Sequence, residues 1–120
     1  MLQLGGIYIP DRKKKLLEKY IEIIKNIYGS KLYSIILFGS YARGDYSDKS
    51  DIDIMILVDM DAETSMRYFN QLSDDTFDFN LDNDLDIEPI AIPKTQFDYW
   101  VDAYPFYKNV QNEGVTLYAA

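Results

Sequence analysis

The chain has 120 residues, of which 48% are hydrophobic, and its 12 basic and 20 acidic residues give a formal net charge of −8. This length suits one domain spanning residues 1–120, and the composition argues against disorder. The negative charge disfavours duplex nucleic acid as a partner, because such binding depends mainly on neutralising phosphates. No apolar run approaches the roughly 20 residues of a membrane span. A basic cluster at residues 12–15 follows an apolar stretch, which is the reverse of a secretory signal, so a cytoplasmic protein is expected.

Hydrophobic spacing predicts an alternation of helices and strands. Helices are expected at residues 11–28, 62–72, 95–103 and 106–113. Strands are expected at residues 31–38, 51–58 and 85–92. Residues 39–50 read as a polar turn with room for one short helix, and residues 73–84 read as an acidic loop with room for a short turn of helix. The last strand is placed near a sheet edge, because Pro89 lacks a backbone donor. This order predicts an α/β (α+β) fold with helices flanking a small mixed β-sheet.

Charge is unevenly spread along the chain. Basic residues crowd the start of the first helix, whereas no Lys or Arg lies between Arg67 and Lys94. That second stretch contains Asp74, Asp75, Asp78, Asp82, Asp84, Asp86 and Glu88. One interpretation is a solvated acidic loop beside a basic helix face. The other is that this polarity helps to dock a basic partner protein.

The turn at Gly39-Ser40 follows an expected buried strand. Gly39 has no Cβ, so the backbone there can approach a phosphate closely. Ser40 adds a hydroxyl, and amides at the start of a following helix favour an anion. A Gly-Ser turn alone is common, so it indicates a phosphate site only together with other residues.

Asp51 and Asp53 form a pair of carboxylates at the start of the second expected strand. Side chains two residues apart on a strand point to the same face. Carboxylates that close would raise each other's pKa unless a cation lay between them. Mg²⁺ suits such a site, since it takes one or two carboxylates together with substrate phosphates. The alternative is a strand entry with two solvated acids.

A third carboxylate comes from the expected strand at residues 85–92, where Asp86 and Glu88 would share one face. If that strand lies beside the one carrying Asp51 and Asp53, either acid can complete the cluster. It could then hold a second ion or take the proton from an attacking hydroxyl. The alternative for Asp86 is that it belongs to the acidic loop before the strand.

Gly39-Ser40, ten intervening residues and Asp51-Ile52-Asp53 together resemble the core motif of the DNA polymerase beta-like nucleotidyltransferase superfamily. The longer strings Phe38-Gly39-Ser40-Tyr41-Ala42-Arg43-Gly44 and Ser50-Asp51-Ile52-Asp53 resemble its smallest branch, the minimal nucleotidyltransferases (MNT). Many MNT proteins are encoded beside HEPN-domain proteins and act as antitoxins to HEPN toxins. The motif covers residues 31–92, and residues 104–115 resemble the C-terminal helix of stand-alone members.

The resemblance implies a polymerase beta-like fold and a role for each motif residue. Asp51 and Asp53 would bind the catalytic ions, with two Mg²⁺ expected. Asp86 occupies the place of the family's third carboxylate and metal ligand, and Glu88 is its rival because both face the same way.

The same resemblance places the triphosphate, with ATP as the expected donor, against Gly39 and Ser40. Ser50 and Arg43 are further nucleotide-binding candidates. Arg43 has two alternatives: it neutralises a phosphate, or it makes a structural ion pair with Asp45, Asp48 or a carboxylate of the site.

The activity expected from the resemblance is Mg²⁺-dependent transfer of a nucleoside monophosphate to an acceptor hydroxyl. The leading hypothesis for the acceptor is a tyrosine of a partner HEPN toxin, which gives the chain an antitoxin role. One alternative is a small-molecule nucleotidyltransferase of the antibiotic-modifying kind, and another is a non-catalytic binding module that masks its partner. The aromatic content of 15% leaves room for a homo- or hetero-oligomer.

Overall fold

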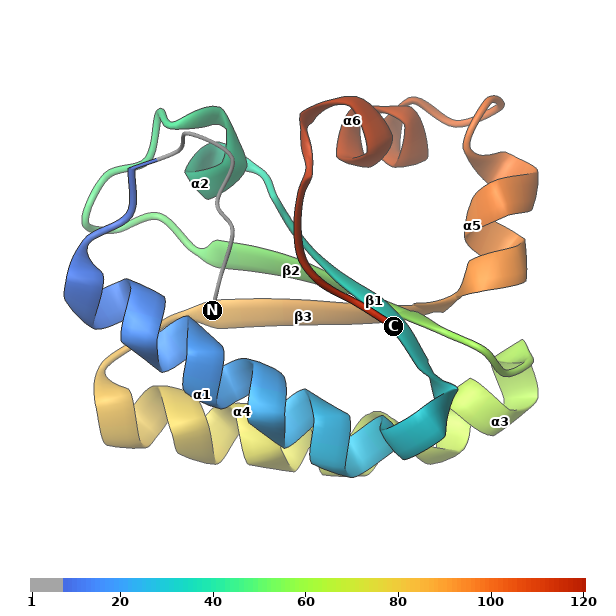
Figure 1. The fold of residues 1–120 in the computed structure, drawn as a ribbon, viewed down its shortest axis with the longest axis horizontal. Coiled ribbons are helices and arrows are strands. Elements are labelled where there is room, and N and C mark those ends of the chain that lie inside the picture. The colour runs from blue at the N-terminus through green and yellow to red at the C-terminus, as the bar shows by residue number, and fades with distance from the viewer. Residues whose placement is uncertain (1–7) are drawn as a thin grey trace.

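A four-stranded mixed sheet forms the centre of the molecule (Figure 1). The computed structural model describes residues 8–120. The strands are β1 (Leu32–Phe38), β2 (Ile52–Val58), β3 (Ile87–Pro93) and β4 (Val115–Ala119), arranged in the order β3-β2-β1-β4. β1 is antiparallel to both β2 and β4, whereas β2 and β3 are parallel. The predicted mixed α/β fold is confirmed. The expected edge position of the strand with Pro89 is also correct, because β3 is an outer strand.

Helices cover both faces of this sheet (Figure 1). They are α1 (Asp11–Tyr28), α2 (Ser40–Arg43), α3 (Ala62–Arg67), α4 (Phe69–Asn83), α5 (Lys94–Trp100) and α6 (Pro105–Glu113), with a 3₁₀ turn η1 (Gly29–Lys31) after α1. α1 and α4 lie side by side below the sheet in Figure 1, while α5 and α6 lie above it. No helix within residues 8–120 is long and apolar enough to cross a membrane. The apolar stretch before the basic cluster begins within residues 1–7, which lie outside the described range.

Two hydrophobic cores follow from the alternation of side chains along β2. Ile54 and Ile56 are buried with the residues of α1 and α4. Met55 and Leu57 are buried with Phe97 of α5 on the opposite face. Burial of each such side chain contributes about 1.5–3 kcal/mol. By the same two-residue period, position 53 belongs to the face that α5 and α6 cover.

The expected acidic loop at residues 73–84 is wrong, because residues 73–83 belong to the helix α4 and Asp84 is its C-cap. Leu72, Thr76 and Phe79 recur at three- and four-residue spacing and are buried. The Thr76 hydroxyl also makes a 2.7 Å hydrogen bond with the Tyr20 hydroxyl of α1. These few contacts anchor the helix while its aspartates occupy other faces.

Other boundaries also differ from expectation. The helix expected at residues 62–72 is two helices, which meet at Tyr68. β4 has no counterpart among the expected elements, and it pairs with β1 after Gly114. β2 and β3 begin at residues 52 and 87, so Asp51 and Asp86 directly precede their strands.

Candidate active site

The turn between β1 and α2 brings backbone and carboxylate into contact. Gly39 has φ +73°, a conformation that disfavours any residue with a Cβ. A Cβ built at this position would overlap Asp53 Oδ2 and lie 3.2 Å from Asp53 Cγ. The Asp53 carboxylate therefore lies directly against the Gly39 backbone. This is the close approach that the sequence assigned to a phosphate, and the structure shows that the carboxylate shares it.

Asp53 lies on β2, which has β1 on one side and β3 on the other. Its register partners are Phe38 on β1 and Glu88 on β3. Partial burial raises the pKa of the Asp53 carboxyl above its ordinary value, and the nearby charges of Asp51 and Glu88 raise it further. Arg43 opposes this shift. The ionised form of Asp53 is therefore less stable here than it would be in water, and a bound cation would stabilise it.

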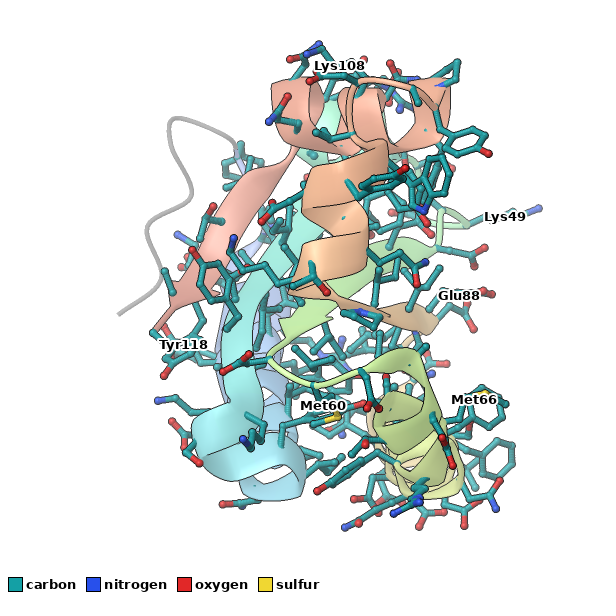
Figure 2. The ribbon with its side chains drawn as sticks, turned by 90° about the vertical axis from the view of Figure 1, so that its right-hand side faces the viewer. Lys49, Met60, Met66, Glu88, Lys108 and Tyr118 are labelled. Atoms are coloured by element: carbon teal, nitrogen blue, oxygen red, sulfur yellow. The ribbon has the colours of Figure 1, made fainter. Side chains whose placement is uncertain are left out.

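Asp51 and Asp86 lie at the entrance to the β2–β3 ladder, and both are exposed. The Ile52 amide donates to the Asp86 carbonyl at 2.8 Å, which holds the two entrances side by side. The two acidic strands therefore lie side by side, which meets the condition that the sequence set for a third carboxylate. Glu88 is the second residue of β3, two positions after Asp86. It is exposed and projects from the outer edge of the sheet (Figure 2).

Four carboxylates thus gather at one end of β2 and β3, but they do not form a closed metal cage. Within residues 8–120 no group of three or more Asp, Glu, His or Cys side chains is arranged to hold a metal ion by itself. The Asp51–Asp53 pair still fits Mg²⁺, because this ion binds through one or two carboxylates and takes its other ligands from water and substrate phosphates. Asp86 as a third ligand stays a prediction.

Arg43, the last residue of α2, makes two ion pairs. Its Nε lies 3.2 Å from Asp45 Oδ2, and its Nη1 lies 3.6 Å from Glu113 Oε2 at the end of α6. The ion pair with Asp45 is one of the two alternatives that the sequence left open. Contact between Arg43 and a phosphate stays a prediction. Glu113 was not among the candidate residues, because nothing in the local sequence places α6 beside α2.

Ser40 and Ser50 are partly buried and lie at the two ends of the loop that joins β1 to β2. The Ser47 amide donates to Ser50 Oγ at 2.9 Å, so this hydroxyl helps to fold the loop before Asp51. Ser40 begins α2, and its carbonyl accepts from the amides of Gly44 and Asp45. The first amides of a helix have no partner within it, which leaves this turn suited to an anion.

Asn80 positions the start of β3, and sequence reasoning missed it. Its side-chain oxygen accepts from the Ile87 amide at 2.9 Å, and its side-chain nitrogen donates to the Ile87 carbonyl at 3.0 Å. This double hydrogen bond fixes the residue that lies between Asp86 and Glu88. The sequence analysis read residues 73–84 as a loop, so nothing in it placed the Asn80 side chain beside the start of β3.

The raised pKa of Asp53 predicts a pH-dependent effect of Asp53→Asn on the metal-free protein. A carboxyl whose pKa is higher in the folded state destabilises the fold when ionised, and this penalty vanishes once pH falls below the unfolded value near 3.8. Thermal unfolding should therefore show Asp53→Asn as more stable than wild type at pH 7, with the difference lost below about pH 4. The exposed Asp48→Asn is the control. An equal gain at both pH values would contradict the assigned cause.

Three features of the site fit a nucleotidyltransferase: the mixed sheet, the Gly39 turn and the acid pair at the start of β2. Comparison with known proteins confirms this class. The nucleotidyltransferase domain family matches residues 12–114. The chain belongs to this family and is a nucleotidyltransferase.

One relative is a Methanocaldococcus jannaschii protein provisionally named a protein adenylyltransferase. It is 34% identical over 106 residues, which cover 88% of this chain and 98% of the relative.

Solved structures share the fold. A toxin–antitoxin solved with AMP-PNP aligns with a TM-score of 0.51 and 22% identity, covering 86% of this chain and 73% of that one. A mutant of the MntA-HpeT toxin–antitoxin aligns with a TM-score of 0.50 and 20% identity over the same shares. At these identities the likeness concerns the fold alone.

Proposed function

We propose that this nucleotidyltransferase moves AMP from ATP to a tyrosine hydroxyl of a partner HEPN-domain toxin and thereby acts as its antitoxin. The observation that carries the catalytic part is the Asp53 carboxylate held against the Gly39 backbone beside Asp51. The raised pKa of the Asp53 carboxyl indicates that a bound cation would stabilise the ionised carboxylate at this position. We assign the cation as Mg²⁺, held by Asp51 and Asp53, with Asp86 as the third carboxylate.

The proposed reaction is an in-line displacement at the α-phosphorus of ATP. The acceptor oxygen forms a bond to this phosphorus while the bond to the oxygen that bridges to the β-phosphate breaks, and pyrophosphate leaves. The acceptor proton passes to Asp86, with Glu88 as the rival base. Bound Mg²⁺ would neutralise the charge that develops on the phosphate oxygens. The Gly39–Ser40 turn and Ser50 orient the triphosphate, and Arg43 supplies positive charge beside them.

The proposed acceptor rests on the comparisons and on charge. The Methanocaldococcus jannaschii relative is named for adenylyl transfer to protein, and the MntA-HpeT structures pair a similar fold with a toxin. The net charge of −8 disfavours a nucleic-acid acceptor. A partner protein therefore fits better than a nucleic acid.

The test uses the purified product of the gene adjacent to this chain's own, which the proposal requires to be a HEPN-domain protein, and ATP labelled at either the α- or the γ-phosphate. With Mg²⁺, label from the α-position should appear on a tyrosine of the HEPN protein, and label from the γ-position should not. Replacing that tyrosine with Phe should remove the label. Transfer from the γ-position, or no labelled protein at all, would contradict the proposal.

A further inference from the structure

The C-terminal end of α6 is packed closely against the sheet. Gly114 follows α6 directly, and a Cβ built there would overlap the Val110 carbonyl oxygen and lie 2.6 Å from Ile36 Cγ2 of β1. The chain then enters β4, which pairs with β1. The last residue of α6, Glu113, is therefore held at a fixed place beside the sheet.

Arg43 is tied by its backbone to the Gly39–Ser40 turn. Its amide donates to the Gly39 carbonyl at 3.1 Å, so the side chain begins one helical turn beyond the glycine that contacts Asp53. The positive charge of Arg43 also favours the ionised form of the Asp53 carboxyl and lowers its pKa. Arg43 therefore acts on the same site as the paired acids.

Two carboxylates hold the Arg43 side chain, which would otherwise sample many rotamers. Asp45 Oδ2 lies 3.2 Å from its Nε, and Glu113 Oε2 lies 3.6 Å from its Nη1. Asp45 is two residues further along the chain and belongs to the same loop region as α2, whereas Glu113 belongs to a separate helix. Of the two, Glu113 is the one that ties the guanidinium to a fixed point outside this turn.

We propose that Glu113 is a positioning residue, which orients the Arg43 guanidinium toward the triphosphate of the nucleotide at the Gly39–Ser40 turn. Glu113 acts through Arg43 and is not placed in contact with the nucleotide. The ion pairs leave further N–H groups of the guanidinium to bind phosphate oxygens, because Arg carries several donors in a rigid fork. This inference rests on the proposed function, since that function places the triphosphate beside Arg43.

Charge alone predicts the opposite effect of Glu113 on nucleotide binding. An anion near a triphosphate weakens its binding by repulsion, so removal of the Glu113 charge would then tighten binding. If Glu113 works by orienting Arg43, its removal weakens binding instead. The direction of the change therefore distinguishes positioning from simple repulsion.

The experiment measures the affinity for a non-hydrolysable ATP analogue in the presence of Mg²⁺ by isothermal titration calorimetry. Glu113→Gln keeps the shape of the side chain and removes its charge. It should bind the analogue about three- to fivefold more weakly than wild type, which is the scale of a half-exposed ion pair. In transfer assays the KM for ATP should rise by a similar factor while kcat changes little, because the reacting atoms are untouched.

Arg43→Gln supplies the second arm of the experiment. Without the guanidinium Glu113 has nothing to orient, so adding Glu113→Gln to this variant should leave the affinity unchanged or slightly tighter. Such a cycle isolates the coupling between the two side chains. Glu63→Gln is the matched control, because Glu63 makes a 3.6 Å ion pair with Arg67 on α3, which follows the far end of β2 from Asp53. It should leave the affinity within about twofold.

Unchanged or tighter binding of the analogue by Glu113→Gln would overturn the positioning role, and so would an equal loss in the Arg43→Gln background. Transfer of AMP by the wild type would leave the proposed function intact in either case. No binding of the analogue by the wild type would overturn both proposals. The expected pattern of affinities without transfer of label to any protein would count against the proposed function alone.

Discussion

Replacing Asp51 and Asp53 together with Asn is expected to lower the rate of nucleotide transfer by at least about 10³-fold, as removal of preorganised charge at an active site does. Both carboxylates are lost while both shapes are kept. Folding should survive, because Asp51 is exposed and ionised Asp53 is disfavoured in the folded metal-free protein. The rate is measured as Mg²⁺-dependent pyrophosphate release in the presence of the proposed acceptor protein.

Asp48→Asn is the control for this double replacement, because Asp48 is exposed in the loop that precedes Asp51. It removes one negative charge nearby without touching the pair and should leave transfer unchanged. Undiminished pyrophosphate release from the double variant would remove the assignment of Asp51 and Asp53 to catalysis.

Gly39→Ala is expected to cost about 100-fold in transfer, which is the scale for a catalytic group displaced by about 1 Å. The new methyl group would occupy the position of Asp53 Oδ2, so the carboxylate has to move. The positive φ adds backbone strain of about 1–3 kcal/mol, so the free energy of unfolding should fall as well. Activity is compared at a temperature where circular dichroism shows the variant fully folded.

Gly29→Ala separates strain from displacement. Gly29 has φ +57° and a similar ψ, but a Cβ there would meet no atom within 4 Å. This variant should lose a comparable part of its stability and keep its transfer rate. If Gly29→Ala lost as much activity as Gly39→Ala, general destabilisation would explain both and the contact with Asp53 would be irrelevant.

Much of the site could be predicted because its residues are close in sequence and lie at the ends of strongly patterned strands. The i and i+2 spacing of Asp51 and Asp53 fixes their common face once β2 forms. Gly39 marks the end of β1, where only a residue without a Cβ fits against a neighbouring carboxylate. The third strand was also predictable, and the structure places it beside β2 in parallel.

What could not be predicted depends on contacts between distant segments. α4 is held by a few contacts, such as the hydrogen bond between Tyr20 and Thr76, which a local reading of its many aspartates cannot find. The Arg43–Glu113 ion pair requires α6 to lie beside α2, and that placement follows from the pairing of β4 with β1. The sequence left open whether Asp86 or Glu88 acts as the third carboxylate. In the structure Glu88 is the register partner of Asp53, and Asp86 directly precedes the same strand.

We propose that Asp51 and Asp53 hold the ion that serves the triphosphate at the Gly39–Ser40 turn. The most direct measurement is an anomalous-difference map from crystals grown with Mn²⁺, as a substitute for Mg²⁺, and a non-hydrolysable ATP analogue. A Mn²⁺ peak is expected in contact with the carboxylates of Asp51 and Asp53 and with the analogue's phosphates. A nucleotide bound elsewhere, or Mn²⁺ found only at the aspartates of α4, would contradict it.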